Sequence, residues 1–287
     1  HAYLLEATLD PESHTVDGQA RIRWVNESDR SVDSLYLHLY LNAFESDDTV
    51  FMRESAGQLR GVDARGRGSI EVTELVLAGD GESSTDLLAT ADDELVEGDR
   101  TQMRVPLPAP VSPGESLVLE ASFRSKLPPV FARSGYAGDF HMVAQWFPKL
   151  ARLEPWGEWE SFPYHAHGEF YADFAYYDLT VTVPEGWVVG ATGRQVDERR
   201  GDGRVTRRFV AEDVHDTAFA AWPHFVEHSE DVDGIGVRVL APPGYGLAVD
   251  RHLEVTRAGL RYFGKLYGPY PYDTLTIIVP PRGAEGA

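Results

Sequence analysis

The sequence predicts a mainly β protein whose C-terminal part changes to a helix followed by a buried strand. Short alternations of apolar and polar residues, with a period of two, recur from residue 19 to about residue 240, and turns rich in Gly and Pro separate them. After residue 246 the apolar residues instead recur at steps of three and four. We therefore expect an all-β sandwich or an open, barrel-like sheet assembly up to about residue 240.

The first two strands are expected between residues 19 and 41. Apolar and polar residues alternate over 20–25, and leucines occupy every second position of 35–41, so both strands have one buried face in an antiparallel sheet. His38 lies on the face opposite the leucines, which favours solvent or an inter-sheet contact over a ligand role. Residues 44–70 are polar and rich in Gly and Arg, and we expect a loop there.

The later strands follow the same pattern of short alternations between turns. They are expected at 70–77, 101–107, 116–123, 178–184, 187–191, 205–210 and 237–240.

The periodicity changes after the Ala-Pro-Pro-Gly turn at 241–244. Apolar residues at helical spacing predict a helix over 247–267, which Gly268 and Pro269 end. The run 275–279 is apolar enough to be a central strand of a sheet. We place a domain boundary near residues 230–244 and divide the chain into a β domain of residues 1–235 and the start of a second domain at 236–287.

Composition excludes several classes of function. The chain has 26 basic and 46 acidic residues, a net charge of −20, which argues against nucleic-acid partners and anionic membrane surfaces. It has no cysteine, so any metal would need His, Asp or Glu ligands. No apolar run is long enough for a membrane span and no signal peptide is visible. The first residue is His1, which suggests that an N-terminal portion was removed, and we favour a soluble protein in a secreted or periplasmic location.

Three histidine patterns are candidates for chemistry. The stretch from His224 to His228 reads H-x-x-E-H, but a shared metal needs these histidines on a helix, and on a strand they would be about 13 Å apart. His165 and His167 would share one face of a strand, and a metal there would need a third ligand. His215 and Asp216 are adjacent, so on a strand their side chains point apart. We interpret all three as structural. With no H-E-x-x-H, G-x-S-x-G or P-loop present, the residues alone show no complete active site.

Five segments occur in a fixed order along nearly the whole chain. They are LYLHLYLNAF at 35–44, QWFPKL at 145–150, YHAHGEFYADFAYYD at 164–178 with the hairpin VTVPEGWVVGATG, VHD and PHF at 214–216 and 223–225, and LRYFGKLYGPYPY at 260–272. In this order and spacing they resemble the zinc aminopeptidases of the aminopeptidase N type, peptidase family M1, in the form found in bacteria.

The resemblance implies a saddle-shaped, mostly antiparallel β domain followed by the first helix and strand of a thermolysin-like catalytic domain. In this family a Gly-rich exopeptidase loop supplies a Glu that binds the free amino group of a peptide substrate. An H-E-x-x-H helix and a later Glu bind zinc, which polarises the scissile carbonyl and activates water. None of these motifs occurs in residues 1–287, so the resemblance places no zinc ligand and no catalytic residue in this chain, and zinc is expected in the full-length enzyme.

The resemblance also implies which residues approach the substrate. The β domain of the family contributes a Gln or Glu to amine binding, and Gln145 is the nearest candidate by position, with Asp139 second. Gly283, Ala284, Glu285, Gly286 and Ala287 are expected to lead into the exopeptidase loop. Glu285 itself is not assigned as the exopeptidase Glu, because no Met precedes it.

Two main functions follow as alternatives, and a generic secreted adhesive β-sandwich, which a closed two-sheet fold with no following helix would support, is a third. In the first, the chain is the non-catalytic part of a peptidase that packs on its own catalytic domain, caps the cavity and is inactive alone, and the sequence is cut before the loop. In the second, it is a non-catalytic scaffold that kept the β saddle and binds peptides or proteins without hydrolysis.

Overall fold

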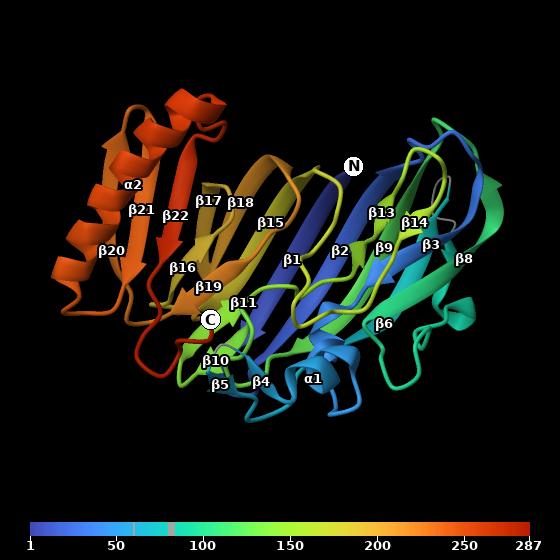
Figure 1. Ribbon diagram of the computed structural model, residues 1–287, viewed down its shortest axis with the longest axis horizontal. Helices are drawn as coiled ribbons and strands as arrows, with labels where there is room; N and C mark the ends of the chain where they lie inside the picture. The colour runs from blue at the N-terminus through green and yellow to red at the C-terminus, as the bar shows by residue number, and fades with distance from the viewer. Residues whose placement is uncertain (60, 80–83) are drawn as a thin grey trace.

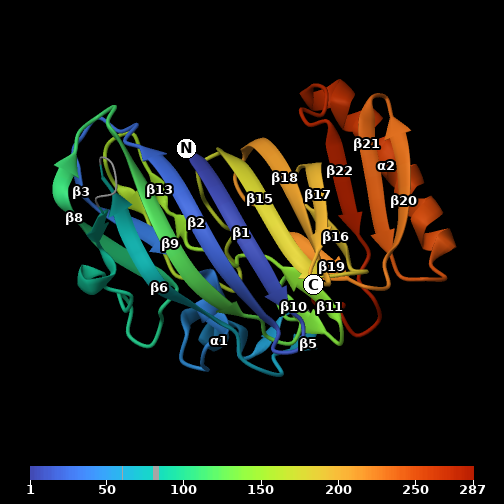
Figure 2. The same ribbon diagram turned by 180° about the vertical axis from the view of Figure 1, so that it is seen from behind.

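The structure, a computed structural model, describes residues 1–59, 61–79 and 84–287 and is built mainly from β-strands. Its largest element is an eight-stranded, twisted sheet (Figure 1 and, from behind, Figure 2). All neighbouring strands are antiparallel except β1 and β15, which run parallel. In spatial order they are β17 (Arg194–Gly201), β18 (Arg204–Val214), β15 (Ala175–Pro184), β1 (Ala2–Asp10), β2 (Thr15–Val25), β9 (Ser116–Lys126), β6 (Ser69–Ala78) and β7 (Ser84–Asp86).

One face of this sheet is buried and the other is charged, because side chains on a strand alternate between the faces. In β1, for example, Leu5 and Leu9 are buried while Glu6 between them is exposed. On the open face, ion pairs join neighbouring strands: Arg124 with Asp17, Arg208 with Asp178, and Arg21 with Glu120.

Two smaller sheets form a second layer. One contains β12 (Lys149–Leu150), β3 (Val32–His38) and β8 (Gln102–Val111), and the other contains β10 (Gly135–Ala137), β11 (Phe140–Val143), β19 (Phe219–Trp222) and β16 (Val188–Ala191). Leu5, Leu37 and Phe219, one from each of the three sheets, belong to the same hydrophobic core. Two short pairs complete the β structure, β13 (Arg152–Leu153) with β14 (Trp159–Glu160) and β4 (Gln58–Leu59) with β5 (Val62–Asp63).

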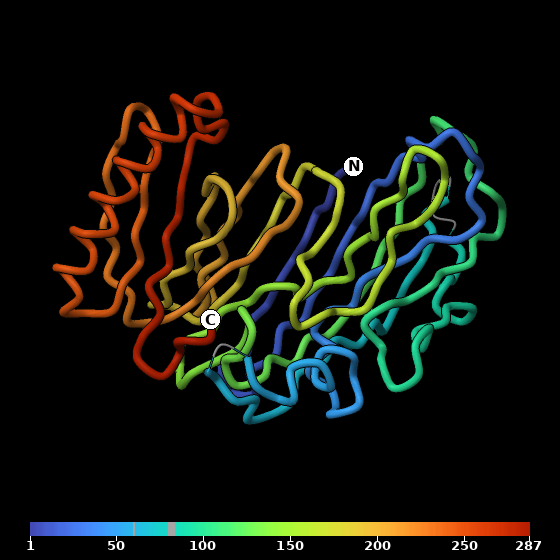
Figure 3. The backbone as a smooth tube through the Cα atoms, in the orientation of Figure 1, coloured from blue at the N-terminus to red at the C-terminus, as the bar shows by residue number. Residues whose placement is uncertain are grey.

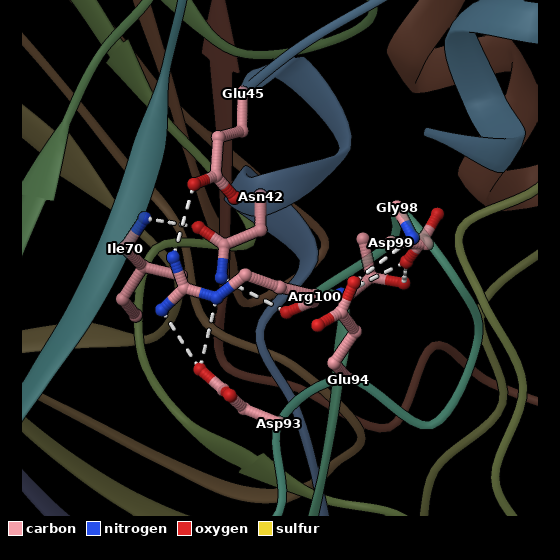
Figure 4. A network of polar contacts seen from close by, with 9 residues as sticks. Asn42, Glu45, Ile70, Asp93, Glu94, Gly98, Asp99 and Arg100 are labelled. Atoms are coloured by element: carbon pink, nitrogen blue, oxygen red, sulfur yellow. Dashed lines mark hydrogen bonds and ion pairs between the residues drawn. The ribbon is translucent and has the colours of Figure 1, made fainter. Parts of the chain in front are cut away.

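A polar network around Asn42 holds the 3-10 turn η1 (Tyr40–Phe44) to β6 and to Arg100 (Figure 4). The helix α1 (Val50–Ser55) precedes β6 in the chain, and the 3-10 turn η2 (Leu88–Thr90) follows it. The Asn42 side chain accepts a hydrogen bond from the Ile70 N–H at 2.7 Å and donates one to the Arg100 carbonyl at 2.9 Å. The Arg100 guanidinium in turn donates to Asp93.

The last part of the chain forms a separate three-stranded sheet. β20 (Val226–Val232) pairs with β21 (Ile235–Ala241), and β22 (Thr274–Ile278) joins β21 in parallel after the helix α2 (Gly246–Tyr267). α2 covers one face of this sheet, and the other face packs on the four-stranded sheet. Gly190 allows the close approach, because a Cβ there would lie 2.6 Å from a methyl carbon of Leu240. The tube in Figure 3 shows the chain turning back after β22 to end near β10 and β11 in Figure 1.

The predicted fold class is confirmed: the protein is mainly β, with several sheets. The structure extends the predictions in several places. β1 and β17 of the large sheet lie outside every expected strand, and two further differences fall in residues 35–70. The strand expected over 35–41 ends at His38, and residues 40–44 form η1, because Asn42 holds that turn to β6. Within the expected loop 44–70, residues 50–55 form α1, which Thr49 caps and whose residues Phe51 and Met52 are buried. Arg60 in that loop lies outside the described residues.

The C-terminal elements lie where they were expected, but they are less buried. β22 is an edge strand, and Phe263 and Tyr267 of α2 are exposed. The division at residue 235 stays a prediction, and the hairpin β20–β21 spans it. In the part of the chain that is described, neither helix is long and apolar enough to cross a membrane.

Candidate functional site

Gln145 lies just beyond β11 in a left-handed backbone conformation, with φ of 55°, which is uncommon for a residue other than Gly. Its side-chain NH2 group donates a hydrogen bond to Asp216 Oδ2. Because this bond uses the NH2 group, the amide oxygen of Gln145 remains a hydrogen-bond acceptor.

Asp216 holds Gln145 because it is itself fixed on two sides. The ammonium of Lys149 lies 3.0 Å from Asp216 Oδ2, and the Thr217 N–H donates to Asp216 Oδ1 at 2.8 Å. The side chains of Lys149 and Asp216 are only 4% and 21% exposed, so this ion pair is largely desolvated. It joins two of the segments recognised in the sequence, QWFPKL and VHD.

Burial shifts the pKa values of the titratable groups around the Lys149–Asp216 pair. Burial, with a smaller contribution from the Lys149 charge, lowers the pKa of His38 to about 3, so His38 is neutral. Burial, with a smaller contribution from the Asp216 charge, raises the pKa of Tyr3 and Tyr177 above the usual range. The Lys149–Asp216 pair is therefore surrounded by neutral aromatic groups.

The segment 283–287 ends beside β10 and β11 (Figure 1) and contacts residues 130–133, which precede β10. The Arg133 N–H donates to the Gly286 carbonyl at 2.9 Å, and Ala284 is fully buried in a cluster with Val130. Glu285 is exposed, and its carboxylate accepts a hydrogen bond from the Gly283 N–H at 3.0 Å, which lowers its pKa.

The structure brings Gln145 close to this segment and places Asp139 elsewhere. The Ser134 hydroxyl bonds the Ala144 carbonyl at 3.0 Å, so the residues next to Arg133 and Gln145 meet at one end of the β10–β11 hairpin. Asp139 is exposed in the turn at the other end of the hairpin. The four residues of β11 between them span about 13 Å. Whether either side chain binds substrate stays a prediction.

Residues with an unfavourable backbone conformation lie at the same end of the β10–β11 hairpin. Ala132 and Arg133 have φ of 47° and 75°, and together with Gln145 they form a group of three left-handed residues other than Gly. Such strain is concentrated at functional sites in proteins. Arg133 was not singled out from the sequence, and no periodicity or motif could have indicated it, because its distinguishing feature is its conformation.

The other histidine patterns have structural partners. His224 and His228 lie before and on β20, an extended segment, as expected, and the His224 ring packs on Trp222. His165 lies 2.8 Å from Glu54 of α1. His215 packs on Phe174, away from the pair made by Asp216. Among the described residues, no three His, Asp or Glu side chains are grouped as metal ligands.

A groove of about 880 Å³ runs along β22, next to the four-stranded sheet. Its lining includes Ala220 and Ile278, and acidic residues such as Asp213 and Asp273 also line it. Among the described residues β22 pairs with β21 alone, so its other edge has no strand partner along this groove; on β22, the Thr274 carbonyl accepts a hydrogen bond from the Tyr270 hydroxyl at 3.3 Å.

Comparisons with known proteins give one informative result. No protein-family model matches the chain, and no curated protein matches it. Among solved structures, a mutant form of the M1 zinc metallopeptidase from Deinococcus radiodurans is similar, with a TM-score of 0.59 and 14% sequence identity. The likeness covers 98% of this chain and 56% of that one. The chain thus has the fold of the N-terminal region of that metallopeptidase and spans little more than half of its length.

Proposed function

We propose that this chain is the N-terminal, non-catalytic part of a zinc aminopeptidase and that it caps the cavity in which the enzyme removes N-terminal residues from peptides. The likeness in fold to a zinc metallopeptidase over 98% of the chain carries this proposal. The five ordered sequence segments support the finer assignment to an aminopeptidase.

The outer face of α2 supports a further domain packed against it. Val249 is buried on the inner face, whereas Val255, Tyr262 and Leu266 are 63%, 61% and 55% exposed. These three lie at helical spacing on one side of α2 and form an apolar stripe. An exposed apolar stripe, like an unpaired strand edge, indicates a surface that another element covers. In the proposal, the catalytic domain covers both the stripe and the free edge of β22.

Gln145 is the residue proposed to meet the substrate. Its amide oxygen would accept a hydrogen bond from the free ammonium group of a peptide, while Asp216 and Lys149 keep the side chain in place. The nearby segment 283–287 would lead into the loop that aligns the peptide backbone. Such a site selects chain ends because the amide oxygen pairs with the α-ammonium group, which only the first residue of a peptide carries.

The residues present do not fit the zinc ion of the proposed enzyme. The described residues contain no group of three metal ligands, His165 is paired with Glu54, and the His224 ring packs on Trp222. The proposal therefore assigns zinc and the hydrolytic step to residues outside 1–287.

The experiment compares residues 1–287 with the protein encoded by the complete reading frame. Both are assayed on an aminoacyl-4-nitroanilide, with zinc and after chelation. We expect zinc-dependent release of the amino acid by the complete protein and none by residues 1–287. Hydrolysis by residues 1–287, or peptide binding without hydrolysis by the complete protein, would overturn the proposal, and the second outcome would favour a scaffold.

The role of Gln145 is tested in the complete protein with Asp139 as a matched control. Replacing Gln145 by Ala removes one charge-assisted hydrogen bond, and we expect kcat/KM to fall about tenfold or more. Asp139→Ala changes an exposed turn, so kcat/KM should stay within about twofold. A loss at Asp139 with none at Gln145 would reverse the assignment.

A further inference from the structure

A tight turn over residues 131–134 has two central residues that are unusual for its type. The Ser134 N–H donates to the Phe131 carbonyl at 3.2 Å, and the Phe131 N–H donates to the Ser134 carbonyl at 3.0 Å. Ala132 and Arg133 between them have φ of 47° and 75°. Positive φ at both central positions defines a type I′ turn, which Asn-Gly normally forms. With Ala and Arg the turn is strained, and such strain persists only where the surrounding structure holds it.

The segment 283–287 supplies one of the contacts that hold this turn. The Arg133 N–H is not used within the turn and donates to the Gly286 carbonyl at 2.9 Å. Gly286 also lies close to the chain, because a Cβ there would be 3.2 Å from Val130 Cγ1 and 3.3 Å from the Val130 carbonyl oxygen. Ala284 is fully buried in the same cluster as Val130. The segment is therefore seated on the turn by close backbone contacts.

The other side of the turn is fixed to the residue before Gln145. The Ser134 hydroxyl lies 3.0 Å from the Ala144 carbonyl oxygen and accepts a hydrogen bond from the Ala144 N–H at 3.2 Å. Ser134 is buried, so water does not compete for these bonds. Hydrogen bonds thus run from the backbone beside Gln145, through the turn, to Gly286.

We propose that the strained turn 131–134 sets the spacing between the Gln145 amide and the residues that follow the segment 283–287. This inference rests on the proposed function, in which Gln145 binds the peptide ammonium and the segment leads into the loop that aligns the peptide backbone. Because one turn carries both contacts, a shift of the segment changes its distance from Gln145. Arg133 acts as a positioning residue through its backbone N–H, since its guanidinium pairs with Glu169. A fixed spacing matters because small misplacements of a bound substrate lower the rate strongly.

The first measurement is made on residues 1–287 and needs no activity. Gly286→Ala places a Cβ against the Val130 backbone and should push the segment off the turn, whereas Gly201→Ala places one in open space on β17. Neither glycine has a positive φ, so both backbone conformations tolerate Ala. Native-state hydrogen exchange should show the Arg133 amide exchanging about tenfold or more faster in Gly286→Ala and unchanged in Gly201→Ala. Equal exchange in both variants and the wild type would refute the seating of the segment on the turn.

The second measurement uses the complete protein and an aminoacyl-4-nitroanilide. Gln145 still binds the ammonium in Gly286→Ala, so KM should stay within about twofold while kcat falls about tenfold, because the substrate is bound but misaligned. Gln145→Ala should then lower kcat/KM less in the Gly286→Ala background than in the wild type, since the two residues act on one substrate. A role in stability alone predicts that the two losses add.

The outcomes separate this proposal from the proposed function. An unchanged kcat in Gly286→Ala, or additive losses in the double variant, would overturn the positioning role and leave the peptidase assignment standing. A complete wild-type protein that hydrolyses no peptide substrate would overturn both. Gly201→Ala should match the wild type in kcat and KM, because its site is open and lies on the exposed strand β17.

Discussion

Replacing Asp216 by Asn tests the ion pair that holds Gln145. The Lys149 side chain is only 4% exposed, so the substitution leaves a buried ammonium without its counter-charge. Removing one partner of a buried ion pair costs about 3–5 kcal/mol of the free energy of unfolding. Lys149→Met should cost less, about 1–3 kcal/mol, because the remaining Asp216 is 21% exposed and still accepts the Thr217 N–H.

Urea unfolding of residues 1–287, followed by circular dichroism, measures these changes from the shift in midpoint at constant slope. The double variant Asp216→Asn/Lys149→Met should be more stable than Asp216→Asn alone, because it removes the buried charge as well. Asp233→Asn is the matched control. It breaks the Arg261–Asp233 pair, in which both side chains are about 60% exposed, and should change stability by less than about 1 kcal/mol. Equal small losses in Asp216→Asn and Asp233→Asn would refute the view that the Lys149–Asp216 pair is desolvated.

Three further predictions concern the fold. Asn42→Ala leaves a backbone N–H and a carbonyl without their partner, and chemical unfolding should show a loss of about 2–4 kcal/mol; a loss below about 1 kcal/mol would contradict the network in Figure 4. The folded-state pKa of His38 is about 3, below the unfolded value, so its contribution to stability is present above about pH 6.5 and is lost as the pH falls toward 3. His38→Phe should therefore reduce the loss of unfolding free energy between about pH 6.5 and 3, and an unchanged pH dependence would contradict the lowered pKa of His38. Val249→Ala should cost about 1–3 kcal/mol in unfolding free energy, whereas Val255→Ala, on the exposed side of the same helix, should be nearly neutral in residues 1–287; similar losses at both positions would contradict the orientation of α2.

An element could be predicted from the sequence where burial of one of its faces produces a regular spacing of apolar residues. Strands β2, β9 and β15 were predicted because one of their faces is buried, which imposes strict alternation of apolar residues. β17 was missed because all eight of its residues are exposed, so its hydrogen bonds to β18 leave no apolar pattern. α1 was missed because it is only six residues long, and its stability depends on burial of Phe51 and Met52 rather than on helical periodicity.

The candidate site was predictable only in part. Gln145 and the segment 283–287 were selected through the family resemblance, but their meeting at one end of the β10–β11 hairpin depends on long-range contacts through Arg133 and Ser134. The Lys149–Asp216 pair joins residues 67 positions apart, and a salt bridge over that separation leaves no local signal.

By itself, the sequence determined the class of the protein, several of its long strands though not β1 or β17, the final helix and strand, and the absence of cysteine ligands, because alternation, helical spacing and composition are local properties of a chain. Only the tertiary structure decided which side chains meet. The contact of Gln145 with Asp216 and the exposed stripe of α2 both depend on how distant strands pair and which faces are covered, and that is settled by burial over the whole molecule.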